Sequence, residues 1–171
     1  MPIIIDEIKK YHNRKAFDCG VEALNQYLQR QARQKTAKNI AKTYVVSESD
    51  RPEIILGYYT VAGYSVIMPF TQIRQYKNYP HPLNAVKLAR IAVDSAYQGQ
   101  HLGEQLLVDA IYRTVRVAEQ IAAIGLFVDP KTPSIVPFYA QYGFLSVESQ
   151  QKTQLEMWLP ISTCREVINT L

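Results

Sequence analysis

The chain has 171 residues, of which 47% are hydrophobic, and a formal net charge of +4 at pH 7. This size favours one domain with a substantial core, and the composition excludes collagen-like and disordered classes. No run approaches the roughly 20 apolar residues that span a bilayer. Acidic Asp6 and Glu7 follow the short apolar run at the N-terminus, which is the wrong order for a signal peptide. We therefore expect a cytoplasmic protein.

The first half of the chain predicts three strands and one helix. Runs rich in β-branched and aromatic residues predict strands at 2–8, 43–49 and 55–68. Apolar residues at helical spacing predict a helix over 21–35, with Asp18 as its N-cap.

The second half alternates strands and helices more regularly. We expect an irregular segment with a short helix at 69–82 and a long helix that ends near residue 119. A short helix should end at Gly143, in the left-handed region. The further elements are a central buried strand at 86–94, another at 121–129, a closing antiparallel pair at 145–149 and 155–161, and a helical tail. The whole predicts an α/β (α+β) fold, with a mixed central sheet flanked by helices in a single domain over residues 1–171.

Neither the cysteines nor the histidines have the spacing of a metal site. Cys19 and Cys164 lie far apart in the sequence, and we expect both thiols to be unpaired. His12, His81 and His101 are scattered and form no zinc pattern. We expect no bound metal.

One stretch, residues 30–42, carries only positive charge, and residues 23–47 contain no acid. A solvated helix face is one interpretation. Such faces normally mix both signs, however, whereas a one-sign patch attracts polyanions. The five cations are Arg30, Arg33, Lys35, Lys38 and Lys42.

The stretch YQGQHLG at 97–103 precedes the long helix. The first turn of a helix has backbone N–H groups without intrahelical acceptors, and these groups bind phosphate. Gly99 and Gly103 remove side-chain bulk there. The sequence therefore predicts a pyrophosphate bound by main-chain amides at 98–104, although on spacing alone a loop without function explains the glycines equally well.

In its context, AVDSAYQGQHLGEQLL resembles the acetyl-CoA loop of the GNAT acetyltransferases, whose pattern is Gln/Arg-x-x-Gly-x-Gly/Ala. Gln98, Leu102 and Gly103 fit this pattern, while His101 replaces the middle glycine at a position where φ > 0 would strain it. FYAQYGF at 138–144 is similar to a second GNAT segment. The resemblance implies the GNAT fold and acetyl-CoA as co-substrate. The residues implied to bind it are Ile91, Ala92, Val93, Gln98, Gly99, Gln100, His101, Leu102, Gly103 and Glu104.

The same resemblance assigns catalytic roles. The main chain at 91–93 would pair with pantetheine and supply an oxyanion donor. Tyr139 matches the family's general acid towards the departing coenzyme A sulfur, and its reference pKa near 10 keeps it protonated at neutral pH. The sequence leaves open whether Arg90, just before this backbone, faces the acceptor or a partner.

A narrower resemblance, to the GNAT toxins of bacterial toxin–antitoxin modules, rests on FDCGVEALNQYL, VKLARIAVD, DPKT and FYAQYGF. It implies acetylation of the α-amino group of aminoacyl-tRNA, a block of translation, a ribbon-helix-helix antitoxin and a homodimer. The basic stretch would then hold tRNA phosphates. Two alternatives stay open: a GNAT enzyme that acetylates a protein or small-molecule amine, and a GNAT-fold binding module that has lost catalysis.

Overall fold

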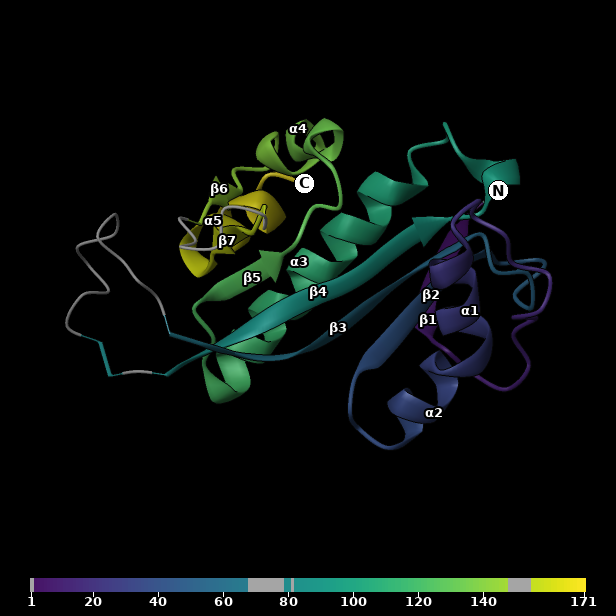
Figure 1. The fold of residues 1–171 in the computed structure, drawn as a ribbon, viewed down its shortest axis with the longest axis horizontal. Coiled ribbons are helices and arrows are strands. Elements are labelled where there is room, and N and C mark those ends of the chain that lie inside the picture. The colour runs from purple at the N-terminus through teal and green to yellow at the C-terminus, as the bar shows by residue number, and fades with distance from the viewer. Residues whose placement is uncertain (1, 68–78, 81, 148–154) are drawn as a thin grey trace. The chain divides into compact units, whose positions relative to one another are not determined.

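The computed structural model describes residues 2–67, 79–80, 82–147 and 155–171. The irregular segment expected at 69–82 lies almost wholly outside them. A seven-stranded mixed sheet, in the order β1-β2-β3-β4-β5-β7-β6, forms the framework of the described residues (Figure 1). Its strands are β1 (Ile3–Glu7), β2 (Lys42–Glu48), β3 (Gly57–Val66), β4 (Leu83–Val93), β5 (Gly125–Val128), β6 (Leu145–Ser146) and β7 (Met157–Pro160).

The helices are α1 (Glu22–Arg30), α2 (Ala32–Ala37), α3 (Leu102–Ile121), α4 (Val136–Ala140) and α5 (Ile161–Asn169). β4 and β5 pair in parallel, because the long helix α3 carries the chain back between them. The pairs β1–β2, β2–β3, β5–β7 and β6–β7 are antiparallel. The predicted mixed sheet with flanking helices is confirmed.

Contacts divide the chain into two compact units. The first comprises Met1–Ala62 and Ala89–Ala110, and the second comprises Gly63–Leu88 and Ile111–Leu171. The expected single domain over 1–171 stays a prediction.

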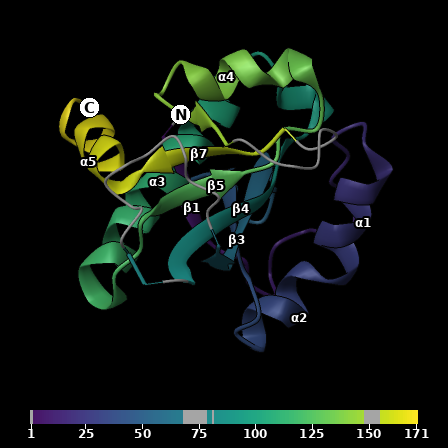
Figure 2. The same cartoon turned by 60° about the vertical axis from the view of Figure 1, so that its left-hand side comes forward.

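In the first unit, α1 and the first half of α3 lie on opposite faces of the sheet (Figures 1 and 2). Val45 of β2 packs in a buried cluster with Tyr27 and Leu28 of α1. Its neighbour Val46 faces the other way, towards Leu106 of α3, as the alternation of a strand requires. The core is thus built on both sheet faces.

In the second unit, aromatic packing dominates. Phe127 of β5 and Trp158 of β7 are stacked with ring centroids 5.4 Å apart, and both are almost fully buried. Cross-strand pairing places them opposite each other in the antiparallel β5–β7 ladder. Gly143 has φ +100°, the left-handed conformation expected after α4.

The predicted helix over 21–35 is wrong in two details. The helix is interrupted at Gln31, which ends α1 and begins α2. Its N-cap is Val21, with no side-chain capping bond, and not Asp18. The carboxylate of Asp18 instead accepts the N–H of Gly20 at 2.9 Å, so it closes the turn that precedes the helix.

Both cysteines are buried free thiols, as expected. Among the helices of the described residues, none is both long and apolar enough to cross a membrane.

Candidate functional site

A polar network fixes the loop that follows β4. The carboxylate of Asp94 accepts two backbone N–H groups, from Ala96 at 2.9 Å and from Asp18 at 3.0 Å. The N–H of Ser95 donates to the carbonyl of Asp18 at 2.8 Å. One carboxylate therefore joins two segments that are 76 residues apart in sequence.

Gln98 ties the same loop back onto the strand. Its side-chain amide donates to the carbonyl of Val93 at 3.0 Å and to that of Cys19 at 3.4 Å. The side chain of Gln98 is thus engaged within the protein. The structure favours a role for Gln98 in shaping the loop, while the backbone amides remain the donors for a ligand.

Asn25 of α1 is a further side chain in this network. Its amide oxygen accepts the N–H of Cys19 at 2.8 Å, and its amide nitrogen donates to the carboxylate of Asp18 at 2.9 Å. Asn25 is buried, and both of its polar ends are satisfied. The N–H of Gly20 and the amide of Asn25 hold the pKa of Asp18 below its usual value, because both hydrogen bonds favour the charged carboxylate.

The loop itself has the backbone that its sequence predicts. Gly99 has φ +83°, and a Cβ there would meet no atom within 4 Å, so the main chain is open on that side. His101 has φ +63°, in the left-handed region that glycine occupies readily. Its side chain is exposed, with Nδ1 3.4 Å from Oε2 of Glu104. The helix α3 begins at Leu102, so the unpaired amides of its first turn follow directly.

The end of β4 belongs to the same unit as this loop. Ala92 is buried, while Ile91 and Val93 are half-buried. A Cβ on Gly57 of β3 would lie only 2.9 Å from the carbonyl oxygen of Ala92, so glycine permits this close approach of the two strands. The structure thus brings all ten predicted acetyl-CoA residues into one unit, along the end of β4, the loop and the first turn of α3.

Tyr139 belongs to the second unit. It lies on α4, is 2% exposed, and packs edge-on against Phe138 and Phe144 with ring centroids 5.1 and 5.4 Å away. Burial raises its pKa to about 12. Its hydroxyl forms no hydrogen bond with any other described residue. The phenol is therefore held by ring packing, and it stays protonated at neutral pH.

The cations of the basic stretch have different surroundings. Arg30 and Lys38 are exposed. Arg33 is half-buried, and its Nε is buried without a hydrogen-bond partner among the described residues. Nζ of Lys35 lies 5.5 Å from the ring centroid of Tyr27.

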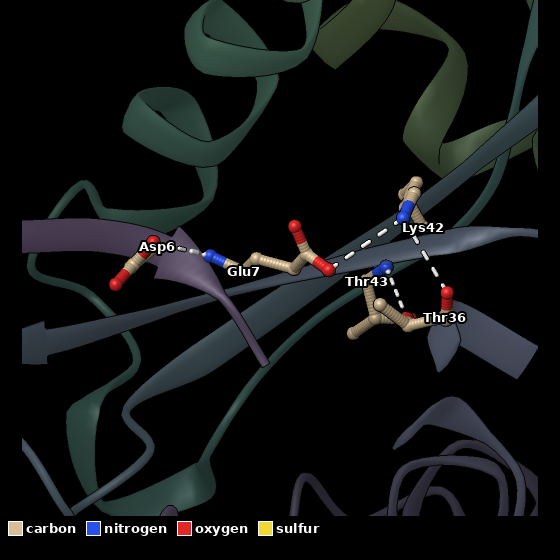
Figure 3. Close-up of polar contacts among 5 residues, drawn as sticks. All are labelled: Asp6, Glu7, Thr36, Lys42 and Thr43. Atoms are coloured by element: carbon tan, nitrogen blue, oxygen red, sulfur yellow. Dashed lines mark hydrogen bonds and ion pairs between the residues drawn. The ribbon is translucent and has the colours of Figure 1, made fainter. Parts of the chain in front are cut away.

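Lys42 is engaged in structural contacts (Figure 3). Its Nζ lies 3.6 Å from Oε1 of Glu7 on β1 and donates to the carbonyl of Thr36 at 3.4 Å. The hydroxyl of Thr36 accepts the N–H of Thr43 at 3.1 Å, which joins α2 to β2. The absence of acids from residues 23–47 therefore does not leave this lysine unpaired, because the sheet brings in an acid from β1.

The comparison with known families decides what this arrangement belongs to. Residues 12–160 match the model of the acetyltransferase (GNAT) domain, which covers most of the chain and includes both the loop and Tyr139. The chain belongs to the GNAT acetyltransferase family. It is an acetyl-CoA-dependent N-acetyltransferase.

Curated relatives of this acetyltransferase lie among bacterial toxins. A tRNA-acetylating toxin of Mycobacterium tuberculosis is 30% identical over 129 residues, covering 75% of this chain and 76% of the relative. A probable toxin TacT of Sinorhizobium fredii is 28% identical over 166 residues, covering 92% of this chain and 90% of the relative.

Solved structures support the fold. A tyrosine-to-phenylalanine variant of KacT has a TM-score of 0.87 at 24% identity, covering 98% of this chain and 99% of its own. AtaT complexed with acetyl-methionyl-tRNAfMet has a TM-score of 0.87 at 23% identity, with the same coverage. At these identities the likeness shows a shared fold.

The loop of this acetyltransferase fits the pyrophosphate of acetyl-CoA. Gly99 leaves its backbone open, and the first turn of α3 offers free amides together with the positive end of the helix dipole. His101 has φ +63°, in the left-handed region that glycine also occupies readily.

Sequence reasoning missed two residues that shape this site, Asp94 and Asn25. Both lie in stretches that carried the resemblance, AVDSAY and FDCGVEALN, but no local pattern shows that their side chains meet. The available signals were an Asp directly after a central strand and an Asn seven residues after an Asp.

Proposed function

We propose that this acetyltransferase acetylates the α-amino group of aminoacyl-tRNA and thereby acts as a toxin that blocks translation. The main observation that supports this proposal is the 30% identity to a tRNA-acetylating toxin over 75% of the chain. The retention of Gln98, Gly103 and Tyr139 together supports catalysis over a binding module, since a lapsed site has no reason to keep all three.

The chemistry of such an acceptor suits the residues present. An α-amino group has a reference pKa of about 7.7–8.0, and esterification of the adjacent carboxyl lowers it, so much of the amine is neutral near pH 7. A strong general base is therefore not required.

Tyr139 stands where the family resemblance implies the general acid, and we propose that it acts on the departing sulfur as a hydrogen-bond donor. Its pKa of about 12 lies above the thiol reference of about 8.5, so the phenol is a ready hydrogen-bond donor but a weak proton donor. In this proposal the Tyr139 hydroxyl donates a hydrogen bond to the departing thiolate, which takes up the proton that the attacking amine releases and leaves as the coenzyme A thiol.

We propose further that the basic stretch contacts the tRNA. Arg30 and Lys38 are exposed and face no acid from their own stretch. Lys42 is a weaker candidate, because it is already paired with Glu7. Phosphate contacts of this kind would make binding strongly dependent on salt.

The partners of the structural neighbours suggest the regulation. AtaT has been solved with the C-terminus of its antitoxin AtaR, and KacTA has been solved with DNA. By analogy we propose that an antitoxin of the ribbon-helix-helix type neutralises this enzyme, and that the enzyme acts as a homodimer.

The test is mass analysis of charged bulk tRNA after incubation with the purified protein and acetyl-CoA. Acetylated aminoacyl ends should form with the wild type and be strongly reduced with Tyr139→Phe. Tyr142→Phe, three residues away, is the matched control and should remain active. Unmodified tRNA in the presence of bound acetyl-CoA would instead direct the search to protein and small-molecule amines.

A further inference from the structure

Two cations from different elements converge on the ring of Tyr27. Cζ of Arg90, on β4, lies 3.8 Å from the ring centroid, and Nζ of Lys35, on α2, lies 5.5 Å from it. Tyr27 is 2% exposed, and its ring is stacked with that of Tyr58. Both cations are half-buried, and all four residues belong to the first unit. We call Arg90, Lys35 and Tyr27 the Tyr27 cluster.

The Tyr27 cluster has no negative charge to balance it. Within the described part of the chain, neither Arg90 nor Lys35 forms an ion pair with an acid. The Tyr58 hydroxyl donates to the carbonyl of Leu24, and burial raises its pKa far above neutrality, so it is uncharged. Like charges beside one ring repel each other, and an anion bound next to both would relieve that repulsion. The arrangement is therefore suited to a bound anion.

The geometry of Arg90 favours phosphate. A guanidinium stacked on an aromatic face is held in one orientation, and the N–H groups along its edge remain available for a planar, two-point contact. Phosphate oxygens match that fork, and the Lys35 ammonium beside the same ring supplies a second positive charge. Stacking on Tyr27 thus prepares Arg90 for a phosphate that binds edge-on.

The position of Arg90 indicates which phosphate this is. The pyrophosphate of acetyl-CoA is accounted for by the amides of the loop and of α3. Arg90 lies one residue before Ile91, and it shares with Ala92 the sheet face that α1 covers. We infer that the Tyr27 cluster binds a phosphodiester near the aminoacylated end of the RNA acceptor. This inference rests on the proposed function and extends it to a specific site.

The experiment compares Arg90→Gln, Arg90→Lys and Lys35→Gln with the wild type. Lys10→Gln, which removes an exposed cation outside the cluster, is the matched control. Initial rates are measured at several salt concentrations with two acceptors: full aminoacyl-tRNA, and an aminoacyl-adenosine that lacks any phosphodiester. Thermal shift with acetyl-CoA shows that each variant is folded and binds its co-substrate.

Arg90→Gln should raise the KM for aminoacyl-tRNA by about tenfold or more, the scale of one charge-assisted hydrogen bond. It should also lower the slope of log KM against log salt by about one. Arg90→Lys should recover part of the loss, because it keeps the charge but not the fork. Lys35→Gln should show a smaller effect of the same kind and keeps the test valid if Arg90 variants fold poorly. Rates with aminoacyl-adenosine and the KM for acetyl-CoA should not change.

Three results would overturn the inference. The first is an equal loss with both acceptors, which would make the cluster structural. The second is a raised KM for acetyl-CoA, which would assign the cluster to a coenzyme phosphate. The third is a wild-type response to salt in both Arg90→Gln and Lys35→Gln. A wild type that acetylates neither acceptor would overturn the proposed function instead, and direct binding of tRNA to the same variants would then decide on the cluster.

Discussion

The loop after β4 and the surroundings of Tyr139 hold their functional groups by opposite means. Hydrogen bonds from Asp94, Gln98 and Asn25 fix the loop, and the groups presented to the ligand are main-chain amides. Tyr139 is held by aromatic packing against Phe138 and Phe144, and its working group is a side-chain hydroxyl. A single substitution can therefore remove the working hydroxyl of Tyr139. The main-chain amides of the loop can be changed only indirectly, by substituting the side chains that hold the loop in place.

The largest effect should come from a change at Tyr139, whose proposed role depends on one side-chain hydroxyl. Tyr139→Phe keeps the packing and removes the donor, so kcat should fall by about 10²-fold or more. The thermal shift caused by acetyl-CoA should be unchanged, because the loop belongs to the other unit. Steady-state kinetics measure the first and a melting curve the second. A normal kcat would remove Tyr139 from the mechanism.

The network around the loop should show the next largest effect. Asn25→Ala leaves the buried N–H of Cys19 without its acceptor, so the free energy of unfolding should fall by about 1–3 kcal/mol. The KM for acetyl-CoA should rise as the loop loosens, with kcat less affected. Denaturant titration gives the stability.

Gln26→Ala is the control, since the amide of Gln26 donates to the exposed Glu22. Equal losses of stability in the two variants would show that the network around Asn25 has no special role.

A smaller effect should follow from relieving the backbone of the loop. His101→Gly places glycine at φ +63° and should raise the free energy of unfolding by about 1 kcal/mol. His101→Val, whose β-branched side chain disfavours that region, should lower it. Thermal melts of both variants provide the check. A stability lowered by glycine would mean that the contact between His101 and Glu104 outweighs the strain.

The smallest effect should be a difference between the two regions in how their stability depends on pH. In the first unit, burial lowers the pKa of His12, whose Nδ1 accepts the N–H of Lys9. The neutral form is the folded one, so this stability is present above the unfolded pKa near 6.5 and is lost as pH falls below it. The lowered pKa of Asp18 acts in the same direction at more acid pH.

Tyr139 should respond at the other end of the scale. Its raised pKa gives stability that is complete below its unfolded pKa near 10 and is lost as pH rises towards about 12. Hydrogen exchange followed at acid and at alkaline pH should therefore show earlier opening around His12 in acid and around α4 in alkali. The reverse order would contradict the assignment of these groups.

Much of the fold was predictable because it depends on local periodicity. The strands β1, β2, β4 and β5 and the long helix α3 fall where alternating, continuous or 3.6-residue apolar patterns place them. The break at Gln31 was not predictable, since the apolar spacing continues across it. The prediction of Asp18 as an N-cap was wrong because the residue types that cap helices also close turns. Only the position of Asn25 distinguishes the two roles.

The candidate site divides in the same way. The glycines, Gln98 and Tyr139 carry recognisable patterns, so the sequence could name them and the chemistry they imply. It could not show that Gln98 bonds Val93 and Cys19, that Lys42 is paired with Glu7, or that Arg90 stacks on Tyr27. The spacing of these residues along the chain has no periodicity from which their contacts could be predicted.

By itself, then, the sequence determined the alternating strands and helices, the glycine-rich entry to α3 and the family to which the chain belongs, because each of these is encoded within a short window of residues. The tertiary structure alone decided which polar groups meet. It brought Asp94 to Asp18 across 76 residues, buried Tyr139 so that its pKa rises to about 12, and placed two cations on one tyrosine ring. Hydrogen bonds, burial and charge depend on distance in space, and folding fixes that distance between residues far apart in the chain.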